Sequence, residues 1–235
     1  MSTEHRLTTG EAGLYGKHPG FGDFIAAGLP EAVFATLGDW LQAVLGDWCA
    51  AAGDGWQAAF DAAPHLGFWI GAGLIGGAPL RGVWAPSRDR AGRRFPLLVL
   101  QSGGGSPVLE PGQDFHQAAR RAIDALAEAR HFDPRDAASR LRAELPAPPD
   151  QPAPDWPTFW AVNPQLPVEA LLGQLREADH LHATSGRSYW WFANGEQGPS
   201  GLLSCQGWPG PSEMGWLIGG GGTFAPTGNL DGGTA

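Results

Sequence analysis

Two glycine- and proline-punctuated segments carry the residues of this sequence that could do chemistry. The first, GKHPGFGDF at residues 16–24, brings Lys17, His18 and Asp23 close together in the chain. The second, PSRDRAGRRFP at residues 86–96, holds four arginines and one aspartate, although the whole chain has a net charge of -9. A lysine beside a carboxylate can transfer protons, and arginines can clamp an anion. The two segments therefore predict either an anion site or a charged contact surface.

Other chemical motifs fail on particular positions. The stretch GAGLIG at residues 71–76 matches a dinucleotide-binding pattern, but Pro79 and further glycines follow it where a helix is needed, so we interpret it as a glycine-rich hairpin. Gly16-Lys17 lacks the earlier glycine and the following Ser or Thr of a P-loop. The pair His180 and His182 has no third ligand nearby in the sequence. We expect no metal site, no cofactor and no catalytic constellation.

Composition limits the class of protein. Of the 235 residues, 43% are hydrophobic and 11 are Trp, which indicates a globular protein, while 36 Gly and 21 Pro predict many turns. The net charge of -9 argues against binding nucleic acid or anchoring through a polybasic membrane segment. The N-terminus has no apolar core like that of a signal peptide, and the most apolar window, residues 68–80, is shorter than the ~20 residues of a membrane-spanning helix. We expect a soluble, cytoplasmic protein.

The elements that must position the two segments can be read from hydrophobic periodicity. Apolar residues recur every three or four positions from Val33 to Trp48, which predicts an amphipathic helix beginning near Glu31. Further helices are expected at residues 54–62, 114–130, 134–144 and 168–178. Strands are expected at residues 66–70, 81–85, 95–101, 188–193 and 202–205, with a short strand entering the first polar segment. Helices and strands are mixed on both sides of the proline-rich stretch 146–157, which favours an α/β fold with helices on both faces of a mixed sheet.

The chain is expected to form one domain. We expect a flexible N-terminus over residues 1–12, a single α/β domain over 13–225 and a disordered tail over 226–235. The proline-rich stretch 146–157 is interpreted as an excursion within that domain, because the strands after it need a sheet to join. We expect six residues of the core to be mostly buried: Trp40, Leu41, Phe95, Leu98, Leu100 and Trp190.

Three ordered motifs resemble those of the TagF family, also called ImpM, which is associated with type VI secretion systems. GLYGKHPGFGDF at residues 13–24 is similar to the family's opening G-x-x-G-K-[LH]-P-x-x-G-D-F, and Leu29-Pro30 and Asp39-Trp40-Leu41 follow at the family's spacing. GVWAPSRDRAGRRFPL at residues 82–97 resembles the second signature, G-V-x-x-P-S-x-D-x-x-G-R-x-F-P-L. SYWW at residues 188–191 resembles the S-x-W-W strand. The sequence departs from the family at residues 207–211, where GWPGP stands in place of the usual G-L-P stretch.

The resemblance implies a three-layer α/β/α sandwich and a cytoplasmic accessory protein that represses the secretion apparatus after translation. It implies action by binding other type VI components, such as the forkhead-associated scaffold protein, with no catalysis. Its motifs give ten expected binding residues: Lys17, His18, Asp23, Phe24, Ser87, Arg88, Asp89, Arg90, Arg93 and Arg94. Two alternatives stay open, namely an enzyme that uses Lys17, Asp23, Asp89 and Arg93 in one cleft, and a module that binds an anionic metabolite there without turnover.

These motifs also make a spatial prediction. We expect the two polar segments to lie together at one end of the sheet, with Asp23 close to the arginines of the second segment, because half-buried charges need partners. Arg93 and Arg94 adjoin the strand that begins near Phe95 and are expected to be structural. Arg88 and Arg90 are expected to contact a partner.

Overall fold

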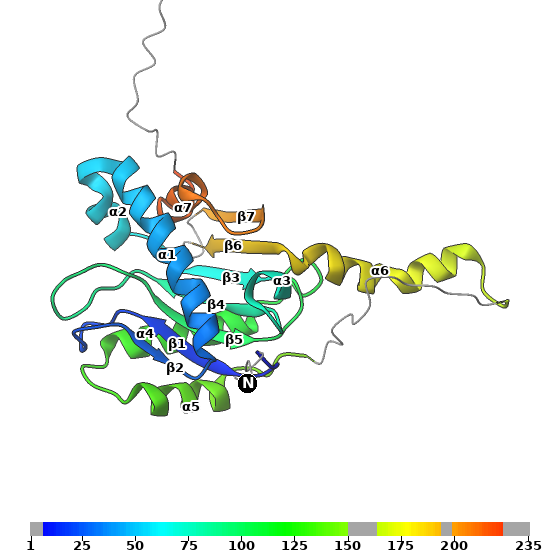
Figure 1. Ribbon diagram of the computed structural model, residues 1–235, viewed down its shortest axis with the longest axis horizontal. Coiled ribbons are helices and arrows are strands. Elements are labelled where there is room, and N and C mark those ends of the chain that lie inside the picture. The colour runs from blue at the N-terminus through cyan, green and yellow to red at the C-terminus, as the bar shows by residue number, and fades with distance from the viewer. Residues whose placement is uncertain (1–6, 150–163, 194–198, 223–235) are drawn as a thin grey trace, which may run out of the picture.

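One seven-stranded sheet organises the part of the chain that the structure describes (Figure 1). In this computed structural model the described residues are 7–149, 164–193 and 199–222. The strand order is β2-β1-β5-β4-β3-β6-β7. The strands are β1 (Ala12–Gly16), β2 (Ile25–Ala27), β3 (Leu66–Ile70), β4 (Leu80–Ala85), β5 (Leu97–Ser102), β6 (Arg187–Ala193) and β7 (Ser200–Gln206).

The expectation of a mixed sheet is wrong, because all six pairings between these strands are antiparallel. Strands that follow one another, such as β3 and β4 or β4 and β5, are joined by short connections and pair directly. A parallel pair needs a crossover of a dozen or more residues, whereas a hairpin needs only a short loop. The fold is therefore α/β in content with an antiparallel sheet.

The five helices that the hydrophobic pattern predicts are present, four of them with shifted ends, and the described residues form two further short helices. The helices are α1 (Glu31–Ala52), α2 (Trp56–Asp61) after a short 3-10 turn (Gly53–Gly55), α3 (Ala72–Ile75), α4 (Asp114–Glu128), α5 (Pro134–Glu144), α6 (Val168–Ser185) and α7 (Pro211–Ile218). Helix α5 begins where expected because Asp133 accepts hydrogen bonds from two backbone amides of its first turn and Pro134 fits that turn. Helix α6 continues seven residues past its expected end at Ala178. The glycine-rich stretch 71–76 joins β3 to β4 and contains the single helical turn α3.

Helices pack on both faces of the sheet. Successive residues of a strand point to opposite faces, so Leu14 lies in a cluster with α4 and α5, whereas Tyr15 lies in a cluster with α1, α2 and α7. Helix α1 contributes the largest share of the second cluster, which also contains Trp84 and Trp190, both without measurable exposure. The sheet is thus covered on both sides, and the polar segments emerge at its end.

Five of the six residues expected in the core are buried: Leu41, Phe95, Leu98, Leu100 and Trp190. Trp40 is half-buried, and its indole nitrogen donates to the carbonyl of Pro209 at 3.0 Å while its ring stacks on Trp208. The segment in which this chain departs from the family pattern therefore covers the end of the core, and α7 follows it.

Packing begins before residue 13. Leu7 is buried and forms a β-bridge with Gly77, and Ala12 begins β1. Residues 1–6, 150–163, 194–198 and 223–235 lie outside the described residues, so the expected disordered tail and most of the proline-rich excursion stay predictions. Among the helices that the structure describes, none is both long and apolar enough to span a membrane.

Candidate functional site

The two polar segments meet because the strands that carry them are neighbours. The first loop, residues 17–24, connects β1 to β2, and the second loop, residues 86–96, connects β4 to β5. Strands β1 and β5 pair antiparallel with Gly16 opposite Leu97. The end of β1 therefore lies beside the start of β5, and both loops leave the sheet at the same end. The expected juxtaposition of the two loops is confirmed.

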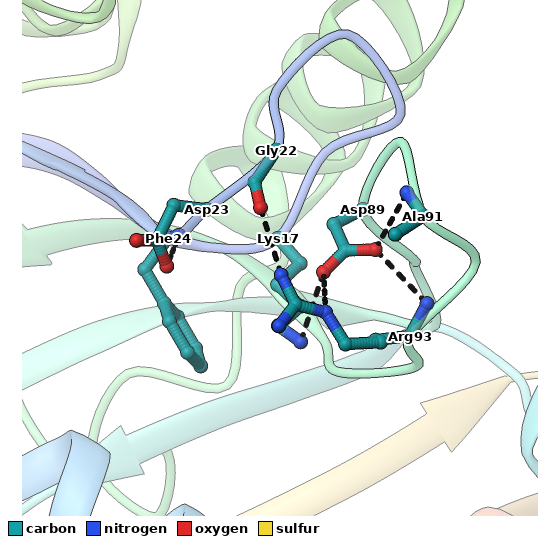
Figure 2. A network of polar contacts seen from close by, with 7 residues as sticks. All are labelled: Lys17, Gly22, Asp23, Phe24, Asp89, Ala91 and Arg93. Carbon is teal, nitrogen blue, oxygen red and sulfur yellow. Dashed lines mark hydrogen bonds and ion pairs between the residues drawn. The ribbon is translucent and has the colours of Figure 1, made fainter.

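Several contacts join the loops directly, and Figure 2 shows two of them, between Lys17 and Asp89 and between Arg93 and Gly22. The Nζ atom of Lys17 lies 3.1 Å from Oδ2 of Asp89. The Arg93 guanidinium donates to the carbonyl of Gly22 at 2.8 Å. The backbone amide of Arg90 donates to the carbonyl of Phe21, also at 2.8 Å. These contacts make the two loops one structural unit, which we call the loop pair (residues 17–24 and 86–96).

Asp89 is the centre of the loop pair. Its Oδ1 atom accepts hydrogen bonds from the backbone amides of Ala91 and Arg93, and Oδ2 accepts from the Arg93 side chain at 2.7 Å and lies beside Lys17. Burial raises the pKa of the carboxyl, but the hydrogen bonds from Arg93 and Lys17 and the charge of Lys17 outweigh it and hold the pKa well below its usual range. Asp89 is therefore ionised near neutral pH, and both of its carboxylate oxygens are bound by groups of the protein. Such a carboxylate is poorly suited to act as a general base.

His18 fastens the first loop to the end of α4. Its side chain is 1% exposed and lies against the rings of Phe21 and Phe132. Its Nε2 atom donates to the carbonyl of Leu126 at 2.8 Å, and Nδ1 accepts from the amide of Gly20 at 3.0 Å. Burial lowers the pKa of His18 and the hydrogen bond to Leu126 partly opposes this, so the ring is neutral near pH 7. Both ring nitrogens are used within the fold.

Asp23 lies close to the second loop, as expected, because its neighbour Gly22 accepts a hydrogen bond from Arg93, but Asp23 itself pairs with no arginine there. Its carboxylate accepts a hydrogen bond from the backbone amide of Phe24 at 2.8 Å and is exposed to solvent. Among the described residues no ion pair joins Asp23 to an arginine of the second loop. Asp89 pairs with Lys17 instead. Phe24 is 39% exposed, packs its ring on Phe95 and lies under the Lys17 ammonium at 5.1 Å.

Arg93 and Arg94 are structural, as expected from the sequence. Arg94 forms a bidentate ion pair with Asp61 at the end of α2: its Nε atom donates to Oδ1 at 2.8 Å and its Nη2 atom donates to Oδ2 at 2.6 Å. The bond to Arg94 lowers the pKa of Asp61, and the same bond raises the pKa of Arg94. Asp61 was not a candidate from the sequence, since nothing in the short stretch WQAAFD indicates a partner in a distant loop.

Arg88 and Arg90 remain exposed on the second loop. In the part of the chain that the structure describes, neither side chain makes a hydrogen bond or an ion pair. The loop beneath them is held by the amide of Phe95 donating to the carbonyl of the half-buried Ser87 at 3.1 Å, and by a bridge between Arg88 and Arg94. The arrangement presents two cationic side chains on a fixed hairpin, which can attract an anion.

The described residues hold no group of three or more metal-ligand side chains. His180 lies on α6 and pairs its Nε2 atom with the hydroxyl of the buried Ser106 at 2.7 Å, while His182 is exposed on the same helix. His180 is therefore bound to Ser106, and this arrangement gives no support to a metal site shared by His180 and His182.

Comparison with known proteins gives a consistent assignment. No curated protein matches the chain. A solved structure, that of PA0076 from Pseudomonas aeruginosa PAO1, is similar to this chain with a TM-score of 0.69 and 28% sequence identity, covering 93% of this chain and 98% of that one. The family model of the TagF N-terminal domain, described as type VI secretion system-associated, matches residues 13–145 and so includes both loops. The chain therefore belongs to the TagF family of type VI secretion system-associated proteins.

Proposed function

We propose that this protein is a cytoplasmic, non-enzymatic accessory protein that represses a type VI secretion system after translation by binding other components of the system. Membership of the TagF family supports the link to type VI secretion. The single observation that carries the binding role is the second loop, where Arg88 and Arg90 are exposed while Asp89, Arg93 and Arg94 are paired within the fold.

A binding role agrees better with this geometry than either alternative from the sequence. An enzyme or metabolite sensor at Lys17, Asp23, Asp89 and Arg93 needs these groups available to a ligand. Lys17 and Asp89 are instead buried against each other, and Asp23 is not part of the cluster. The two exposed arginines are therefore the groups best placed to meet another molecule.

The chemistry of the partner follows from these arginines. Guanidinium groups bind carboxylates and phosphates with two parallel hydrogen bonds, so the matching surface is acidic or phosphorylated. A forkhead-associated scaffold of the secretion system is the partner that the family resemblance suggests, and we include it in the proposal. An internally braced hairpin loses little conformational freedom on binding, which favours its use as a recognition surface.

The test is a charge reversal in cells that lack the wild-type gene. We predict that Arg88→Glu with Arg90→Glu releases secretion of a type VI substrate at normal protein abundance. Exposed charges contribute little to stability, whereas like charges facing each other across an interface cost several kcal/mol. A matched control is Arg140→Glu with Arg142→Glu, which reverses two exposed arginines at the same spacing on α5.

The control pair is expected to keep repression intact. Full repression by the Arg88 and Arg90 variant would remove this loop from the interface. Deletion of the gene is the wider test, since equal secretion with and without the protein would refute the repressor role itself.

A further inference from the structure

An apolar groove opens beside the loop pair, between α1 and α2. Its volume is about 340 Å³, and Arg94 and Phe95 at the end of the second loop form one wall. Leu45, Cys49 and Phe60 are among the other residues that line it. Leu45, Phe60 and Phe95 are buried and Cys49 is half-buried, so most of the lining is apolar, while Gln42 and Arg94 add polar groups.

Residue 46, on the α1 wall of the groove, has no side chain. Gly46 lies in the middle of the 22-residue helix α1 and lines the groove, and a Cβ atom added to it would meet no other atom within 4 Å. Gly38 in the same helix differs, since a Cβ atom there would lie 2.4 Å from the Tyr15 hydroxyl. Packing therefore explains Gly38 but not Gly46. A glycine inside a helix costs about 1 kcal/mol relative to alanine. Gly46 therefore lowers the local stability of α1, although no packing contact requires a glycine there.

Basic groups stand at the rim of the groove. Arg94 is held there by Asp61, and its guanidinium lies 5.8 Å from the centre of the Trp56 ring, which also lines the groove. Arg88 forms a β-bridge with Arg94, so the exposed Arg88 stands near the same rim. Binding hot spots typically combine an apolar pocket with Trp and Arg side chains around it.

We propose that this groove receives an apolar side chain of a partner polypeptide whose flanking carboxylates meet Arg88 and the rim. The proposal rests on the proposed function, because it adds an anchor to the surface that Arg88 and Arg90 form. Charge complementarity identifies the occupant. An uncharged apolar ligand would form no ion pair with the arginines, and a purely acidic ligand would leave the apolar groove empty. A polypeptide segment with an apolar side chain between carboxylates contacts both.

The decisive variant fills the groove. Because Gly46 lines the groove, Gly46→Leu is expected to place a side chain in it, and the added Cβ atom meets no other atom within 4 Å, so the helix is not strained. We expect it to release type VI secretion as the Arg88 and Arg90 reversal does. Gly46→Ala is the matched control, because it gains the same helix propensity but leaves most of the groove open, and we expect it to repress normally. Both variants are expected to melt at or above the wild-type temperature, which excludes misfolding as the cause.

Cys49 provides a second readout inside the groove. The chain has two cysteines, so Cys205→Ser leaves Cys49 as the only thiol. We expect N-ethylmaleimide to label Cys49 more slowly in cells that contain the other type VI components than in cells that lack them. Arg88→Glu with Arg90→Glu is expected to abolish this protection.

The outcomes separate this inference from the proposed function. If the arginine reversal releases secretion while Gly46→Leu represses normally and Cys49 is labelled equally in both strains, the groove proposal is overturned and the repressor role stands. If deletion of the gene leaves secretion unchanged, the repressor role fails, while protection of Cys49 by type VI components still supports the groove. If the purified protein self-associates and Gly46→Leu abolishes that association, the occupant is a second copy and the proposal is overturned.

Discussion

Asp89 is the residue on which the geometry of the loop pair depends most. It is 2% exposed and is the ion-pair partner of the buried Lys17. We predict that Asp89→Asn lowers the melting temperature by roughly 10 °C, because removing one member of a buried ion pair leaves the other charge uncompensated. Asp23→Asn is the control, since Asp23 is exposed and accepts one local hydrogen bond. Thermal unfolding followed by circular dichroism measures both, and equal melting temperatures for the two variants would refute the central role of Asp89.

At the residue scale the sequence predicted correctly that the two loops meet, but it did not predict which groups pair between them. The charges of Lys17, Asp89 and Arg93 were recognisable as a set, and the structure brings these three together. Asp23 was chosen as a partner on charge alone, yet the group that meets Arg93 from the first loop is the carbonyl of Gly22. Every residue has a backbone carbonyl, so no residue type can predict that contact.

Strand β6 is the element whose placement matters most for the core. Trp190 on this strand has no measurable exposure, stacks on Phe68 with ring centres 4.8 Å apart and donates from its indole nitrogen to Ser188. We predict that Trp190→Ala lowers the free energy of unfolding by ~3–5 kcal/mol, through lost burial and the cavity left behind. Urea denaturation measures the loss. The proposed function is expected to be lost together with the fold.

Leu202 on the neighbouring strand β7 gives the matched control. It pairs with Trp191 in the ladder but is 66% exposed, so Leu202→Ala is expected to change the free energy of unfolding by less than about 0.5 kcal/mol. A Trp190→Ala variant as stable as Leu202→Ala would contradict the burial of β6.

Helices and strands were predictable where the apolar residues that become buried repeat at a regular spacing along the sequence. Helix α1 shows the 3.6-residue repeat, and β5 reads as a continuous apolar run because both its faces are covered. Strand direction carries no such signature, since a strand buried on both faces reads the same in parallel and antiparallel pairs. The mixed sheet was therefore a wrong inference from the presence of both helices and strands on each side of the proline-rich stretch. The end of α6 was also missed, because Thr184 and Ser185 are poor helix formers in isolation.

For the molecule as a whole, charge is distributed unevenly. The chain carries a net charge of -9, whereas the second loop concentrates four arginines around one buried aspartate. A basic hairpin on an acidic protein directs an anionic partner to one place and repels it elsewhere. This distribution supports recognition of a specific acidic surface and agrees with the absence of a general basic footprint in the sequence.

Two histidines, the buried His18 and the half-buried His116, link the stability of the whole fold to pH. His116 on α4 donates from Nε2 to the carbonyl of Phe68 at 3.3 Å, and its Nδ1 atom is buried without a partner among the described residues. Burial lowers the pKa of His116 to about 4, and the positive charge of Arg81 adds to the effect. His18 is shifted in the same direction, again because of burial. Both rings are therefore neutral in the folded protein at pH values where an unfolded chain begins to protonate them.

We predict that the free energy of unfolding falls as the pH is lowered from about 6.5 towards 4. A pKa that is lower in the folded state means that the unfolded chain binds more protons in this window, so acid favours unfolding, and the stabilisation is complete above about pH 6.5. For His116 alone, the shift from 6.5 to about 4 corresponds to about 3 kcal/mol. Urea denaturation between pH 7.5 and 4.5 measures the slope, with the pH values chosen to bracket roughly this window. His116→Gln keeps an amide donor for the Phe68 carbonyl but cannot titrate, so it is expected to reduce the dependence of the free energy of unfolding on pH. A wild-type free energy of unfolding that stays constant across the same range would show that neither histidine resists protonation in the folded protein.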